Sequence, residues 1–240
     1  QALETANSAT AAIGFPALIA AERDPLVLPT LLRAAGAYQD IAVRDAILRR
    51  LEAGLTPLAT QAAYEALGAQ RDDAPYDLLV AAAQTPSING IAQVGAIRGL
   101  AATRRAEAVA VLLPLARDGG SDYAVRRFVV PALAELGKHV EQPVRTRIAD
   151  ALAALLRDPV YQVAVAAARG LATMEATEAI PALEQFARSR VQQEAVVARR
   201  AADALRKAGA PAASTQQKQL QELRTQLRRL EEEVQRLRRE

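Results

Sequence analysis

Arginine is the residue type of this chain best suited to binding chemistry. A guanidinium group holds a carboxylate through two parallel hydrogen bonds, so arginines gathered on one face could bind an acidic peptide or a carboxylate. The same side chains could instead bond to neighbouring aspartates and to carbonyl groups between stacked helices, as every helical repeat requires. Both interpretations stay open for the arginines that recur at related positions of a repeated segment: Arg44, Arg98, Arg126, Arg127, Arg169, Arg199 and Arg200.

Groups that could activate water or a nucleophile are sparse. His139 is the single histidine; it follows a predicted helix end, where we expect it to complement the helix dipole or to face solvent. The H-E-x-x-H motif and a Gly-rich phosphate loop are both absent. We therefore predict no catalytic residue, no metal ligand and no cofactor. The serines lack a nearby histidine and the acidic clusters are expected to be solvated: Ser8, Ser87, Ser121, Ser189, Ser214, Asp72-Asp73 and Glu231-Glu232-Glu233.

Composition argues against several classes of protein. The formal charge is only +3, because 27 acidic residues nearly balance the 30 basic ones. Proteins that bind nucleic acid usually concentrate basic charge on one face instead. Cysteine is absent, which fits a reducing compartment. No apolar run reaches the roughly 18–20 residues that span a bilayer. We expect a cytoplasmic protein that binds neither nucleic acid nor membranes, and its start at Gln1 instead of Met favours a fragment of a longer chain.

The elements that would position these side chains repeat along the sequence. A helix of small residues ending in Leu or Leu-Gly restarts about every 34 residues, most clearly at Arg98-Gly99-Leu100-Ala101 and Arg169-Gly170-Leu171-Ala172. A helical pattern at such a period is typical of stacked repeats, and alanine lets neighbouring helix axes approach closely. No segment alternates as a strand would. We predict an all-α chain in which residues 1–208 form an α-solenoid of about six helix pairs.

Periodicity and proline or glycine breakers place the individual helices. One stretch has two parses: residues 40–53 and 55–69 both look like the second helix of a pair. Either a first helix has been lost there, or 40–53 takes the first-helix role. The predicted helices span 3–13, 16–22, 25–36, 40–53, 57–69, 75–84, 89–102, 104–118, 121–137, 142–157, 160–173, 176–190 and 193–208.

The units resemble HEAT repeats. The segment Ala179-Ile180-Pro181-Ala182-Leu183 resembles the first helix of such a unit, and Leu28-Pro29-Thr30-Leu31-Leu32 is similar to it. The segment Asp40-Ile41-Ala42-Val43-Arg44 resembles the second helix of such a unit. Asp40 would cap the helix start, and Arg44 would form an ion pair with Asp40. Pro131 falls inside a predicted helix, where we expect a kink.

The end of the chain has a different pattern. Residues 209–215 form a linker of small residues, and 216–240 follow as an amphipathic heptad helix. Its apolar residues are spaced as the a and d positions of a coiled coil. The seam could pair two copies of the chain, or it could lie along the end of the solenoid. Its residues are Leu220, Leu223, Leu227, Leu230, Val234 and Leu237.

Residues 75–240 also resemble the C-terminal HEAT-repeat region of bacterial zinc aminopeptidases of the membrane-alanyl (gluzincin) type. The matching stretches include residues 91–101, Tyr123-Ala124-Val125-Arg126-Arg127, 179–184 and 201–206, followed by the heptad tail. In that family the zinc ligands and general base lie in an upstream domain, so no catalytic residue is carried over. The resemblance implies a non-catalytic domain that caps a peptidase domain in cis or holds a partner.

Two other functions remain open. The chain could be a freestanding scaffold that binds a protein or peptide in its groove and self-associates through the tail. It could also resemble the HEAT-like bilin lyases or helical-repeat DNA glycosylases, although the absence of Trp and the balanced charge argue against DNA binding.

Overall fold

The computed structural model describes residues 13–117, 123–189 and 194–209, and this part of the chain is all-helical, with no strand. Two helices span residues 13–21 and 194–209. Three short 3-10 helices cover Arg71–Asp73, Ile88–Gly90 and Thr177–Ala179. The others are α2 (Leu28–Gly36), α3 (Ile41–Glu52), α4 (Pro57–Gly68), α5 (Tyr76–Gln84), α6 (Ile91–Ala102), α7 (Ala108–Arg117), α8 (Tyr123–Gly137), α9 (Val144–Leu155), α10 (Tyr161–Thr173) and α11 (Ile180–Ser189).

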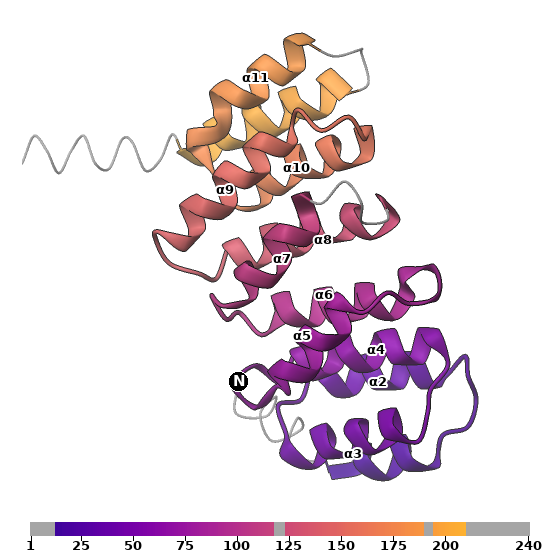
Figure 1. The fold of residues 1–240 in the computed structure, drawn as a ribbon. Coiled ribbons are helices and arrows are strands. Elements are labelled where there is room, and N and C mark those ends of the chain that lie inside the picture. Colours follow the sequence, from indigo (N-terminus) through magenta and orange to yellow (C-terminus); the bar gives the residue numbers. More distant parts are fainter. Residues whose placement is uncertain (1–12, 118–122, 190–193, 210–240) are drawn as a thin grey trace, which may run out of the picture.

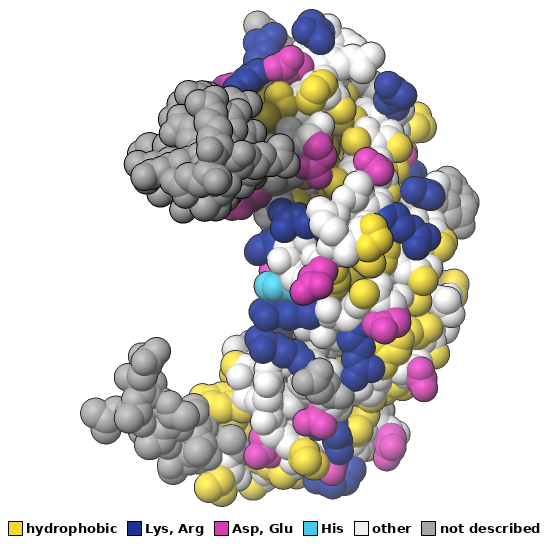
Figure 2. Space-filling view, turned by 90° about the vertical axis from the view of Figure 1, so that its left-hand side faces the viewer, with side chains coloured by type: hydrophobic (Ala, Val, Ile, Leu, Met, Phe, Trp, Pro, Cys, Tyr) yellow, Lys and Arg dark blue, Asp and Glu magenta, His cyan; other side chains and the backbone are white. Residues whose placement is uncertain are grey.

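The helices stack in two rows (Figure 1). We call α2, α4, α6, α8 and α10 the inner row, because each packs directly on the next. The outer row contains α3, α5, α7, α9 and α11; α5, α7 and α9 each pack on the inner helix that follows in the chain. The stack is curved, and its hollow side, which the inner row lines, carries several Lys and Arg side chains (Figure 2).

The row arrangement decides between the two parses of the N-terminal third. Helix α2 packs on α4, and α4 on α6, so residues 57–68 belong to the inner row. Helix α3 makes smaller contacts with both α2 and α4 and therefore lies outside that row. The segment 40–53 thus takes the first-helix position despite its motif. The prediction that Leu28–Leu32 belongs to a first helix was wrong, because α2 lies in the row of second helices.

Two kinds of close packing hold the inner row together. Between α2, α4 and α6 the backbones themselves meet at glycines: a Cβ on Gly68 would lie 2.1 Å from the carbonyl oxygen of Gly99, and one on Gly95 would lie 2.6 Å from the Gln61 backbone. Between α8 and α10, Gly170 faces side chains, Ala134 Cβ at 3.1 Å and Leu152 Cδ1 at 3.2 Å. The glycine contacts of the first half are thus with backbone, whereas the nearest neighbours of Gly170 are side chains.

Helix ends largely follow the predicted breakers. The Asp40 carboxylate accepts hydrogen bonds from the backbone N–H groups of Ala42 and Val43, which confirms the predicted cap. Arg44 does not return the predicted pair to Asp40; it bonds to Asp45 and approaches Asp73 instead. The predicted helix 104–118 begins later, at Ala108, because Arg104 adopts a left-handed backbone conformation with φ of 59°. Helix α8 continues through Pro131.

The core divides into two clusters of buried apolar residues. One lies under helix 13–21 and α2, α3 and α4, and the other runs from α5 to helix 194–209; Tyr64 packs against both. Alanine and leucine dominate each cluster, as the composition predicted. The tail seam, Leu220, Leu223, Leu227, Leu230, Val234 and Leu237, lies outside the described residues, as does the linker after residue 209.

Candidate functional site: a groove on the inner row

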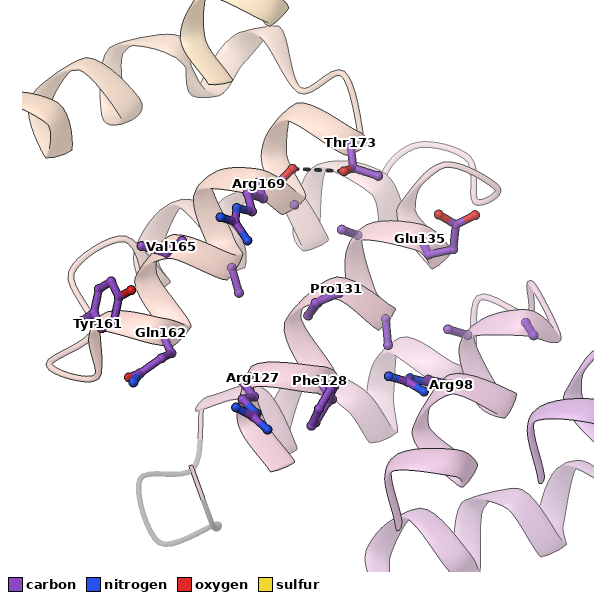
Figure 3. Close-up of a pocket in the computed structure, with 16 residues that line it drawn as sticks. Arg98, Arg127, Phe128, Pro131, Glu135, Tyr161, Gln162, Val165, Arg169 and Thr173 are labelled. Atoms are coloured by element: carbon purple, nitrogen blue, oxygen red, sulfur yellow. Dashed lines mark hydrogen bonds between the residues drawn. The ribbon is translucent and has the colours of Figure 1, made fainter. Parts of the chain in front are cut away.

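A groove among the described residues runs over α6, α8 and α10 (Figure 3). Its volume is about 950 Å³, enough for several amino-acid side chains of a ligand. Each of these three helices supplies one arginine to the groove: Arg98 from α6, Arg127 from α8 and Arg169 from α10. Alanines and larger apolar side chains form the surface between them, so the groove combines positive charge with an apolar floor.

Helical spacing explains which side chains enter the groove. On α8, Phe128, Pro131 and Glu135 are three and four residues apart and therefore share one face. On α10, Tyr161, Val165 and Arg169 share a face by the same spacing. Facing stripes on neighbouring helices enclose the groove between them, with the ring of Tyr161 49% exposed at one end.

Arg98 is already paired within the protein. Its guanidinium donates a 2.7 Å hydrogen bond to the carboxylate of Glu65, which also accepts from Arg33 at 2.8 Å and from Gln61 at 2.9 Å. Burial of the Glu65 carboxyl opposes its ionisation, but the hydrogen bonds from Arg33, Arg98 and Gln61 outweigh burial and lower its pKa below the ordinary value. Glu65 therefore stays ionised and neutralises much of the charge that α2 and α6 bring to the inner row.

Arg127 and Arg169 differ from Arg98. Both are exposed, and within the described residues neither forms an ion pair with a carboxylate. The Arg127 guanidinium stacks over the ring of Phe128 at 4.8 Å from its centroid, and Arg98 covers the same ring at 5.1 Å. Such cation–π contacts hold an arginine in place while leaving its hydrogen-bond donors available. Among the described residues, no carboxylate compensates the positive charge that these two arginines bring to the groove.

Pro131 changes the backbone of α8 at the floor of the groove. Proline has no N–H, so it cannot donate the helical hydrogen bond to the carbonyl of Arg127 four residues earlier. Pro131 is exposed and points into the groove (Figure 3). The groove thus combines cationic donors with the apolar ring of Pro131.

The acidic residue of the groove is compensated locally. Glu135 accepts a hydrogen bond from Lys138 at 2.9 Å, and His139 Nε2 lies 3.4 Å from the same carboxylate. The Lys138 hydrogen bond is the main cause that lowers the pKa of Glu135 below its ordinary value. His139 therefore lies beside a helix end with an acidic neighbour, and Glu135 does not cancel the charge of Arg127 or Arg169.

The structure separates the seven predicted arginines. Arg98, Arg127 and Arg169 line the groove together. Arg126 does not: it is 4% exposed, and its guanidinium donates to the carbonyl of Ala116 and to Asp158. Arg44 lies on the outer row with Asp45. Both therefore have the structural role that the sequence also allowed. Arg199 and Arg200 lie on helix 194–209, away from the groove, with Arg199 beside Glu184, Arg188 and Arg206.

Neither a metal nor a membrane site emerges from the part of the chain that the structure describes. No three His, Cys, Asp or Glu side chains gather there as metal ligands would. Every described helix is too short or too polar to cross a bilayer.

Comparison with known proteins leaves the chain unassigned: no protein-family model matches it, and no curated protein matches its sequence. The groove itself is therefore the evidence on which a function can be argued.

Sequence reasoning missed the apolar members of the groove. Phe128, Tyr161 and Val165 were not singled out, because aromatic and aliphatic residues on a helix are usually core. Pro131 was singled out only for a kink. A signal was present: Phe128 is one of only three phenylalanines, and it directly follows two arginines on a predicted second helix.

Proposed function

We propose that this chain is a HEAT-like α-solenoid of about six helix pairs that acts as a non-catalytic interaction domain, binding a segment of a partner protein in the groove over α6, α8 and α10. Helices α3 to α10 pair consecutively, outer with inner, which fits such repeats. The observation that carries the proposal is a groove in which Arg127 and Arg169, without a carboxylate partner among the described residues, lie beside an apolar floor. Binding sites typically combine concave apolar surface with a few polar groups in this way, which supports a binding surface.

Site-specific photocrosslinking in the source cells tests the proposal. Benzoylphenylalanine replaces Tyr161 in the groove, and in a matched control it replaces Ile88, which is 73% exposed and lies outside the groove. We expect a discrete covalent adduct of one mass from position 161 and none from position 88. A Tyr161 probe that yields no adduct, or equal adducts from both positions, would contradict the proposal.

The resemblance to zinc aminopeptidases specifies one partner: a peptidase domain upstream in the same polypeptide. This version stays a prediction, and the reading frame that precedes Gln1 tests it. A metallopeptidase domain encoded there would support a cap role, with the groove facing or recruiting a peptide. A reading frame without such a domain would leave the freestanding scaffold, in which the tail seam pairs two copies.

A further inference from the structure

The charges that face the groove over α6, α8 and α10 do not balance. Arg98 is matched by Glu65, and Glu135 is matched by Lys138 and His139. Arg127 on α8 and Arg169 on α10 remain without a carboxylate partner among the described residues. Since they belong to adjacent inner helices, a ligand lying between these helices would meet a guanidinium from each (Figure 3).

The surface between the two arginines is apolar. Phe128 and Pro131 come from α8, and Val165 and Tyr161 come from α10. Burying one bulky side chain there would remove apolar surface of both ligand and groove from water, which favours binding.

Resting on the proposed function, we propose that the groove binds an acidic peptide segment of a partner protein, with one bulky apolar residue flanked by Asp or Glu on both sides. The apolar residue packs on Phe128 and Pro131. The flanking carboxylates accept hydrogen bonds from Arg127 and Arg169. Guanidinium groups suit this task because they hold carboxylates through paired donors in a fixed plane.

Two other occupants fit less well. The chain's own segment 216–240 carries seven basic and five acidic residues, a net of 7 − 5 = +2, so it does not supply the negative charge that the groove lacks. Nucleic acids present a long run of phosphates and need many cations. Two arginines that no described carboxylate pairs with, beside an apolar floor, match a short acidic segment better.

Fluorescence anisotropy with defined peptides tests the inference on the full chain. The probe is fluorescein-labelled Glu-Asp-Glu-Leu-Phe-Asp-Glu-Asp, and the matched controls replace its acidic residues with Gln and Asn, or with Lys. We expect saturable binding of the acidic probe. The amide control should bind about 100-fold more weakly, because a neutral amide cannot form charge-assisted hydrogen bonds with the two guanidinium groups. The Lys control should not bind.

Protein variants locate the binding. Arg127→Gln/Arg169→Gln should weaken the binding of the acidic probe by about 100-fold. The control Arg49→Gln/Arg147→Gln, which removes two exposed arginines outside the groove, should leave the affinity unchanged. In Arg127→Glu/Arg169→Glu the preference should reverse toward the Lys peptide, an outcome that misfolding cannot produce. Circular dichroism confirms that each variant is folded.

Three results would overturn the inference: equal affinity for all peptides, loss of binding in the Arg49/Arg147 control, or no reversal in the double Glu variant. Saturable binding of a single-stranded oligonucleotide that requires Arg127 and Arg169, with no binding of the acidic peptide, would also overturn it. If the probe at position 161 forms an adduct but the acidic peptide does not bind, only the acidic ligand class is rejected. If neither the adduct nor peptide binding is observed, the proposed function is rejected as well.

Discussion

The inner row has two halves that use the same kind of helix differently. Between α2, α4 and α6 the backbones touch at glycines, and Glu65 neutralises arginines from both neighbouring helices. Between α6, α8 and α10 the larger side chains Phe128 and Tyr161 line the groove, and no carboxylate in the described part of the chain pairs with Arg127 or Arg169. The two halves therefore differ by one carboxylate and a few glycines. We call the half of α2, α4 and α6 the closed half, and the half of α6, α8 and α10 the open half.

The largest expected effect comes from adding a methyl group to the closed half. In Gly68→Ala the new Cβ would overlap the Gly99 backbone, which cannot move without separating α4 from α6. We expect a loss of about 3 kcal/mol or more in the free energy of unfolding, measured by urea denaturation. Gly170→Ala is the matched control in the open half, where the neighbours are side chains and the expected change is within about 1 kcal/mol. Equal losses would remove the distinction in packing.

A smaller effect is expected when Glu65 is neutralised. Glu65→Gln weakens its hydrogen bonds with Arg33 and Arg98, which are themselves 45% exposed, so we expect a loss of about 1 kcal/mol at neutral pH. Because the pKa of Glu65 is lowered in the folded protein, its contribution is present above the ordinary value near 4.5 and is lost as pH falls through the lower folded pKa. The two proteins should converge in stability at low pH. A gap that persists or widens on acidification would show that another group causes it.

A comparable or smaller change is expected at Phe128, where the two halves meet. Phe128→Leu keeps an apolar side chain but removes the ring that Arg98 and Arg127 both cover. We expect a loss of about 0.5–1 kcal/mol in thermal or urea unfolding. Tyr76→Leu, which removes the ring under Arg105, provides a second cation–π site for comparison. No loss at Phe128 would mean that the ring does not position these arginines.

The least effect on folding is expected from the groove arginines. Arg127→Gln/Arg169→Gln removes two exposed cations without ion-pair partners in the described structure, so the free energy of unfolding should change by no more than about 0.5 kcal/mol. Arg126→Gln, one residue away but buried against Asp158, should cost about 3 kcal/mol. Differential scanning calorimetry of the two variants measures this contrast. Similar losses in both would assign the groove arginines a structural role.

Much of the fold could be predicted from the sequence, because proline, glycine and capping residues mark helix ends locally. Helix α4 begins at the predicted Pro57, and α10 begins one residue from its predicted start. The row to which α3 belongs could not be predicted, since its motif matched a second helix and only packing on α2 and α4 assigns it.

The groove was predicted less well than the helices. Arg98 is neutralised by Glu65, a residue 33 positions earlier, which no local pattern indicates. Arg126 and Arg127 looked equivalent in sequence, yet neighbouring helical residues point about 100° apart, so one is buried and the other exposed. Which arginine stays free depends on contacts between repeats.

Hydrogen exchange of the full chain with and without the acidic probe peptide tests the central claim most directly. Bound ligand lowers local opening, so amides that it covers exchange more slowly. We expect protection confined to α8, α10 and the facing part of α6, no change in α2 and α4, and no effect in Arg127→Gln/Arg169→Gln. Protection spread over both halves of the inner row, or centred on the Glu65 half, would contradict the account.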